Sequence, residues 1–196
     1  MRKAVSNLQY WRKRKLNYDI LIPKLDKNIY DLTEQETAEY FDWYVEQIPQ
    51  RVEYLSQVCA TQMKVPKEKL DCSPESLLIL WKWFRKSAKT ERIPNGRQLT
   101  LETEYILRDI GMYLGETFRK NKEGTYWTYY TKPQNDFFVN TPLLKGFVDM
   151  SAGKPFYAAF EPVHMARMQA CKILKHKSKD DDLLNLYHIW DRMQTQ

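Results

Sequence analysis

Residues 101–131 read LETEYILRDIGMYLGETFRKNKEGTYWTYYT, and the change of pattern at Gly124 indicates the fold class. Before Gly124 apolar residues recur at helical spacing, so we expect a helix from about Leu101 to Lys120. After it, residues 125–131 are aromatic or β-branched, a composition that suits a half-buried strand. This succession predicts an α+β fold that is mainly helical, with a small antiparallel sheet in the C-terminal half.

Further strands are predicted on both sides of this stretch. Residues 132–136 are polar and rich in turn-forming types, and the apolar segments 137–139 and 144–150 then offer two short strands. Near the other end of the chain, residues 18–22 can add an edge strand that Pro23 would end.

Most of the remaining chain carries helical signals, and residues 32–120 are expected to be helical around one core. Thr33-Glu34-Gln35-Glu36 matches the capping box that begins a helix. Ser73-Pro74-Glu75 is a second start, with an N-cap serine and a first-turn proline. Pro162 begins a helix in the last third, and apolar positions between Leu183 and Met193 form the stripe of a final one.

A single core is predicted, because 196 residues fit one domain. Leu77, Trp81 and Phe84 share one helical face, so we expect Trp81 and Phe84 to be buried. Pro49 interrupts the pattern after the capping box and leaves two alternatives, a second helix or a kinked continuation. The chain divides into a basic N-terminal segment with a possible edge strand, residues 1–30, and one globular α+β domain, residues 31–196.

The net charge of +6 is a property of the N-terminus. Residues 1–15 contain six basic residues and no acid, which leaves 25 basic and 25 acidic residues in the rest of the chain. A basic face spread over the whole domain would indicate phosphate tracking, whereas a basic end segment indicates a narrower binding element.

The sequence contains no recognisable motif for catalysis or metal binding. The three histidines lie twelve residues apart, too far for one local ligand set, and the three cysteines are widely spaced. No nucleophile elbow or glycine-rich phosphate loop is visible. We therefore predict no catalytic residues, no metal site and no cofactor, and a protein that is more plausibly not an enzyme.

The cellular location is predicted from similar negative signals. The first residues are basic but lack the apolar stretch of a signal peptide, and no window is long and apolar enough to span a bilayer. We expect a cytoplasmic protein with reduced thiols and no integral membrane association.

Gly111 and Gly115 lie four residues apart on one stripe of the predicted helix, just before Glu116. Glycine inside a helix costs ~1 kcal/mol relative to alanine, so the pair needs a compensation. The favoured explanation is close packing of another element, with Glu116 facing solvent or capping a neighbour. The alternative is a ligand groove with Glu116 at its rim.

Three short segments resemble a known group of proteins: residues 70–77 with the helix start Ser-Pro-Glu-Ser-Leu, the segment Gly-Met-Tyr-Leu-Gly-Glu at residues 111–116, and Trp127. Over about residues 30–150 the chain resembles uncharacterised proteins of Gram-positive bacteria. Some proteins of similar layout look like immunity or accessory proteins near secreted toxins, so the resemblance implies such a role and carries no catalytic residues. Inhibitors of nucleases are commonly acidic, and a neutral body with a basic end departs from that class.

Two functions from different classes follow, with an enzyme of unrecognised type as a third. The first is a non-enzymatic protein-binding module, an immunity or regulatory protein, whose candidate contact residues include Glu116 and Trp127. The second is binding of nucleic acid or an anionic surface through the N-terminal segment. In that segment the candidate residues are Trp11, Arg12, Lys13, Arg14 and Lys15.

The N-terminal segment has two alternative uses. It either binds a partner or forms a strap over an acidic face of its own domain. The strap is slightly favoured, because terminal segments with large apolar residues such as Leu8, Tyr10 and Trp11 usually find a surface to cover.

Overall fold

The computed structural model describes residues 18–23 and 25–195. The elements in chain order are a 3-10 helix Ile29–Asp31, α1 Glu34–Met63, a 3-10 helix Lys67–Lys69, α2 Ser76–Ser87, β1 Thr90–Ile93, β2 Gly96–Leu99, α3 Leu101–Asn121, β3 Tyr126–Thr128, β4 Leu143–Asp149, β5 Phe156–Phe160, α4 Pro162–Leu174, α5 Asp182–Asp191 and β6 Gln194–Thr195. The predicted α+β class is confirmed, as is a mainly helical chain with small antiparallel sheets.

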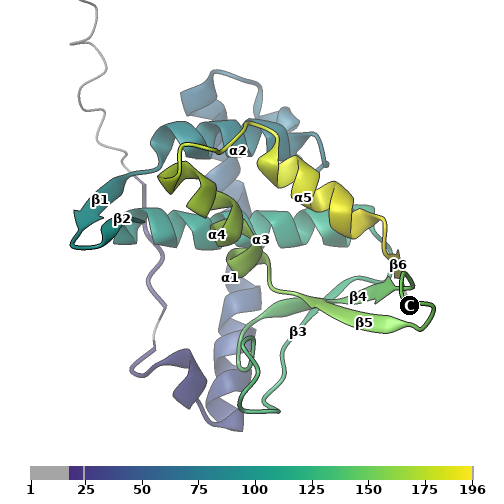
Figure 1. Cartoon of the computed structure of the whole chain (residues 1–196). Helices are drawn as coiled ribbons and strands as arrows, with labels where there is room; N and C mark the ends of the chain where they lie inside the picture. The colour runs from purple at the N-terminus through teal and green to yellow at the C-terminus, as the bar shows by residue number, and fades with distance from the viewer. Residues whose placement is uncertain (1–17, 24, 196) are drawn as a thin grey trace, which may run out of the picture.

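Helix α3 is the centre of the fold. It packs against α1 and α4, while α2 packs against α1 and α5. Figure 1 shows α1 running across α3, so that the N-terminal half of α1 extends beyond the helical layer and passes beside the strands. That half of α1 therefore keeps an exposed side.

The core forms around the apolar faces of these helices and one side of the sheet. Leu77, Trp81 and Phe84 are fully buried, which confirms the prediction made from their shared face. Phe118 of α3 continues the core toward the sheet, where its ring packs against Phe147, Phe160 and Tyr187.

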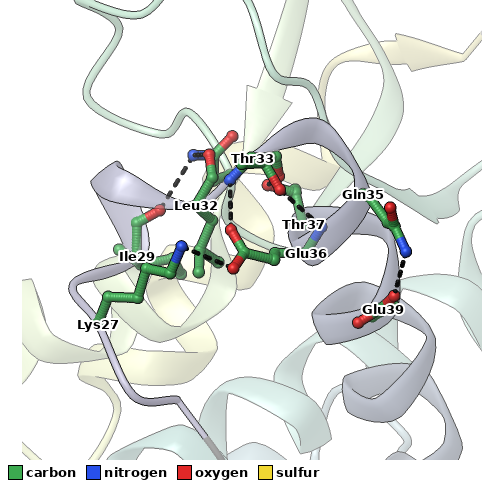
Figure 2. A network of polar contacts seen from close by, with 9 residues as sticks. Lys27, Ile29, Leu32, Thr33, Gln35, Glu36, Thr37 and Glu39 are labelled. Atoms are coloured by element: carbon green, nitrogen blue, oxygen red, sulfur yellow. Dashed lines mark hydrogen bonds and ion pairs between the residues drawn. The ribbon is translucent and has the colours of Figure 1, made fainter.

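The local signals for helix starts are confirmed in detail at α1. Thr33 Oγ1 accepts a hydrogen bond from the Glu36 amide at 3.2 Å, and Glu36 Oε2 accepts one from the Thr33 amide at 2.8 Å (Figure 2). The helix then continues through Pro49, so the segment is one helix rather than two. At the other predicted start, α2 begins only at Ser76, after a turn in which Ser73 Oγ accepts from the Ser76 amide at 3.3 Å.

The main sheet has the order β3-β4-β5, with β6 also paired to β4, and all pairs are antiparallel. The strand predicted at residues 125–131 is shorter than expected, Tyr126–Thr128. The predicted strand at 144–150 is present as β4. Strands β5 and β6 were not predicted.

Three predictions about strands and helices are wrong. Residues 137–139 form turns, because Asp136 accepts a hydrogen bond from the Phe138 amide at 2.8 Å and Asn140 has a positive φ of 63°. Residues 32–120 are not all helical, because the turn at Ile93–Gly96 closes the β1–β2 hairpin.

The edge strand predicted at residues 18–22 is the third. Its backbone is bound by side chains instead of a neighbouring strand. The Asp19 amide donates to the Tyr54 hydroxyl at 2.7 Å, and Arg51 Nη2 donates to the Asp19 carbonyl at 2.7 Å. This segment is therefore fastened to α1.

No helix among the described residues is long and apolar enough to cross a bilayer.

Candidate functional site

The candidate binding residues chosen from the sequence fall into two groups. Trp11 and the basic run Arg12 to Lys15 lie outside the described residues. Glu116 and Trp127 are described and meet directly, because Trp127 Nε1 donates to Glu116 Oε1 at 2.8 Å. Glu116 also forms an ion pair with Arg119.

The two helical glycines explain how this contact is made. A Cβ at Gly115 would overlap the indole ring of Trp127, and one at Gly111 would lie 2.6 Å from Val163 Cγ2 and 2.8 Å from its Cα. The glycines thus allow β3 and α4 to approach α3, which is the favoured explanation of the pair. Glu116 anchors the tryptophan at this packing contact.

We expect Gly115→Ala to lower the free energy of unfolding by ~1 to 3 kcal/mol, the usual cost of overpacking. The reason is that the added methyl group must displace the Trp127 ring. The cost of this displacement exceeds the ~1 kcal/mol by which alanine stabilises an exposed helix position relative to glycine. Urea denaturation of both proteins measures the difference. A stabilised variant would contradict close packing at this position.

The exposed side of α1 carries a charge pattern that the net charge of the chain conceals. The helix contains six acids and one base, Arg51, which is buried. Glu34, Glu36 and Glu53 form ion pairs with lysines from other segments. The other three acids, Glu39, Asp42 and Glu46, are exposed and pair with no cation among the described residues.

A groove of about 350 Å³ lies beside these acids, between the N-terminal half of α1 and the segment that precedes it. Its lining is acidic, aromatic and aliphatic, with one lysine. The lining residues are Leu25, Asp26, Lys27, Leu32, Glu36, Glu39, Tyr40 and Trp43.

The polar wall of the groove is held in place by the helix start (Figure 2). Lys27 Nζ lies 2.6 Å from Glu36 Oε1, while the other oxygen of Glu36 accepts from the Thr33 amide. The hydrogen bond from Lys27, followed by those from Thr33, lowers the pKa of Glu36 to about 2. Glu39 accepts a hydrogen bond from Gln35 at 2.9 Å and remains exposed. Glu36 is thus anionic at neutral pH.

Two aromatic side chains line the groove. The Tyr40 and Trp43 rings stack with centroids 5.7 Å apart and an interplanar angle of 25°. Burial raises the pKa of Tyr40 to about 12, so its hydroxyl stays a neutral donor. Stacked rings beside carboxylates suit a guanidinium or ammonium group, which gains from both the ring face and the negative charge.

The sequence reasoning missed this groove, although part of its signal is local. Glu36, Glu39, Tyr40 and Trp43 follow the spacing i, i+3, i+4, i+7, which places them on one helical face. The other wall comes from Leu25 to Lys27, which no periodicity connects to α1.

A second groove, of about 370 Å³, lies where the β4–β5 hairpin meets the end of α5. Its lining includes Met150, Ile189 and Met193, with the opposite charges of Asp149 and Arg192. It offers no concentration of one sign of charge and no aromatic lining, so it defines no ligand chemistry.

Glu161 is a buried carboxyl group at the start of α4. Burial raises its pKa to about 7. Such shifts are typical of functional sites, but both carboxylate oxygens accept backbone amides of α4, from Val163 and His164. Glu161 therefore acts as the cap of this helix, and we assign it no reaction.

Metal binding has no support in the described part of the chain, where no group of three or more His, Cys, Asp or Glu side chains could hold an ion.

Comparison with known proteins gave no match to a family model, a curated protein or a solved structure.

Proposed function

We propose that the protein is a non-enzymatic protein-binding module whose α1 groove takes a basic, aromatic segment of a partner protein. The observation that carries the proposal is the acidic groove lined by the stacked Tyr40 and Trp43. An immunity or regulatory role fits this chemistry, because acidic inhibitor surfaces complement cationic partners.

The described contacts support a groove that is largely preformed. Lys27 and Thr33 fix Glu36, and Tyr40 and Trp43 are already stacked. Binding of a partner therefore loses little free energy to ordering of the site. Aromatic and arginine side chains commonly contribute most of the binding energy at such contacts. Exposed Glu39, Asp42 and Glu46 add long-range attraction that falls as salt rises.

We also propose the cytoplasm as its place of action. Cys59, Cys72 and Cys171 are free thiols, and burial raises the pKa of Cys59 to about 12 and of Cys72 to about 11. Buried thiols with raised pKa values, such as Cys59 and Cys72, react slowly, and free cysteines suit a reducing compartment.

The test uses three fluorescent probes with the full chain: a peptide of alternating arginine and tryptophan, its counterpart with glutamate for arginine, and single-stranded oligothymidylate. Fluorescence anisotropy should detect binding of the basic peptide alone. The reason is that a cationic aromatic segment satisfies both the carboxylates and the rings of the groove.

Glu39→Lys should weaken this binding about tenfold, which corresponds to ~1.4 kcal/mol. Glu68→Lys is the matched control, because Glu68 is also exposed and lies outside the groove. Equal affinity of the two variants would contradict the proposed site. Binding of oligothymidylate without the peptide would instead favour the alternative function, nucleic-acid binding through residues 1–15.

A further inference from the structure

We propose that the α1 groove has an intramolecular occupant, the basic segment of residues 1–15, which a partner must displace. This inference rests on the proposed function and adds its regulation. Two observations carry it, the charges of the two surfaces and the point at which the described chain begins.

The charges of the segment and of the groove are opposite in sign. Residues 1–15 carry six basic side chains and no acid. The flank of the groove presents Glu39, Asp42 and Glu46 without cations from the described residues, and Asp26 lines the groove itself. Tyr10 and Trp11 precede the run from Arg12 to Lys15, so aromatic rings and cations occur together, as the groove requires.

The anchor of Tyr18 sets the starting point of the segment. The Tyr18 hydroxyl donates to Asp109 Oδ2 at 2.7 Å, and its ring lies 5.0 Å from that of Tyr54. Tyr54 and Trp43 are eleven positions apart on α1, about three helical turns, so they lie on the same face of the helix. Tyr18, to which the basic segment is joined, therefore lies against the face of α1 that bears the groove.

The distances allow the segment to reach the groove. Tyr54 lies about 17 Å along the helix axis from Trp43 at 1.5 Å per residue. Trp11 and Tyr18 are seven positions apart, and an extended chain of that length spans about 24 Å. Trp11 can thus reach Trp43, while Arg12 to Lys15 come within reach of Glu46, which lies between Trp43 and Tyr54 on α1.

Because residues 1–15 belong to the same chain as the groove, even a weak attraction between them favours binding. A segment joined by a short linker has an effective concentration in the millimolar range, so an intrinsic affinity in that range is enough to occupy the groove. A partner then binds only if it competes with the segment, and its apparent affinity is reduced accordingly.

Trypsin digestion of the full chain tests this inference, because the segment contains the cleavage sites Arg2, Lys3 and Arg12 to Lys15. Mass spectrometry follows the loss of the segment. At low salt the chain should be cleaved about tenfold more slowly than a synthetic peptide of residues 1–17, and high salt should abolish the protection. Cleavage at the rate of the free peptide at both salt concentrations would overturn the inference.

Two double variants locate the contact. Glu39→Lys with Glu46→Lys should restore fast cleavage, whereas Glu68→Lys with Glu123→Lys should leave the protection intact, since Glu68 and Glu123 are exposed, remote in sequence from the groove and do not line it. Unchanged melting temperatures exclude unfolding as the cause. Protection that survives the first double variant would overturn the assignment to α1.

Competition with a partner is measured separately. Neutralising Arg12, Lys13, Arg14 and Lys15 to glutamine should tighten binding of the arginine–tryptophan peptide to the full chain about tenfold, since the internal competitor is weakened. No change, or weaker binding, would overturn the competition.

The two proposals fail in different ways. Peptide binding to the groove with an unprotected segment would refute the internal occupant and leave the binding function. The opposite result is a protected segment and no peptide binding, even in the variant with glutamine at residues 12–15. It would show that the segment only covers its own domain, and it would refute the binding function.

Discussion

Replacing Asp109 with alanine is expected to lower the free energy of unfolding by ~3 to 5 kcal/mol, the cost of leaving a buried charge without its partner. The Asp109 side chain is 1% exposed and that of Arg51 is 6% exposed. Asp109 Oδ2 accepts from Arg51 Nη2 at 2.5 Å and from Arg51 Nε at 3.1 Å. Without the carboxylate, the guanidinium remains in the core, where the Asp19 carbonyl is its one remaining hydrogen-bond acceptor among the described residues.

The same carboxylate joins three segments. Its oxygen also accepts the hydroxyl of Tyr18, and burial, followed by the charge of Asp109, raises the pKa of Tyr18 well above its ordinary value. Loss of Asp109 therefore also loosens the segment that leads into the groove.

Urea denaturation with a matched surface pair measures the effect. Glu102→Ala removes the partner of Lys89 in a more exposed ion pair, 42% and 29% exposed, and should cost less than ~1 kcal/mol. The double variant Arg51→Met, Asp109→Leu should recover most of the stability lost in Asp109→Ala, because it removes both charges. If Asp109→Ala lowers the free energy of unfolding by less than ~1 kcal/mol, water reaches the Arg51–Asp109 ion pair, and the account of a buried pair is wrong.

Trp81→Ala is expected to cost ~3 to 5 kcal/mol, the range for removing a large aromatic side chain from a core. Trp81 is fully buried, and its ring lies 5.0 Å from that of Phe84 on the same helix. The neighbouring core is built from several helices, so it cannot collapse fully into the space left by the indole.

Two further variants test whether the loss of stability comes from core packing. The Trp81 Nε1 group is buried without a hydrogen-bond partner among the described residues, so Trp81→Phe removes an unsatisfied donor and should cost much less than the alanine variant. Leu101→Ala, at a side chain that is 67% exposed, should change stability by less than ~0.5 kcal/mol. If Trp81→Ala behaves like Leu101→Ala, the core is not formed around α2.

The fold was predictable from sequence where a local signal decides the structure. The capping box at Thr33, the long helix through Gly111 and Gly115, and the proline start of α4 each depend on neighbouring residues. Strand pairing depends instead on residues that are distant in the sequence. Strand β6 forms only because Val148 and Phe147 of β4 pair with Gln194 and Thr195. The two residues of β6 carry no sequence pattern that predicts a strand.

The candidate site was less predictable, for two physical reasons. Averaging charge over the whole domain concealed the acidic side of α1, because cations elsewhere in the chain balance it. Periodicity finds one face of one helix, whereas the groove also needs Leu25 and Lys27 from a separate segment. The sequence singled out Glu116 and Trp127 as candidate contact residues, and the structure shows that they pack β3 onto α3.

Nuclear magnetic resonance titration of the full chain with the arginine–tryptophan peptide tests the central claim most directly, because it locates the binding site. The backbone amides of residues 25–27 and 36–46 and the indole N–H of Trp43 should shift together and saturate together, while those of the β4–β5 hairpin stay unchanged. Shifts confined to other surfaces, or no saturable shift at Trp43, would contradict a binding groove on α1.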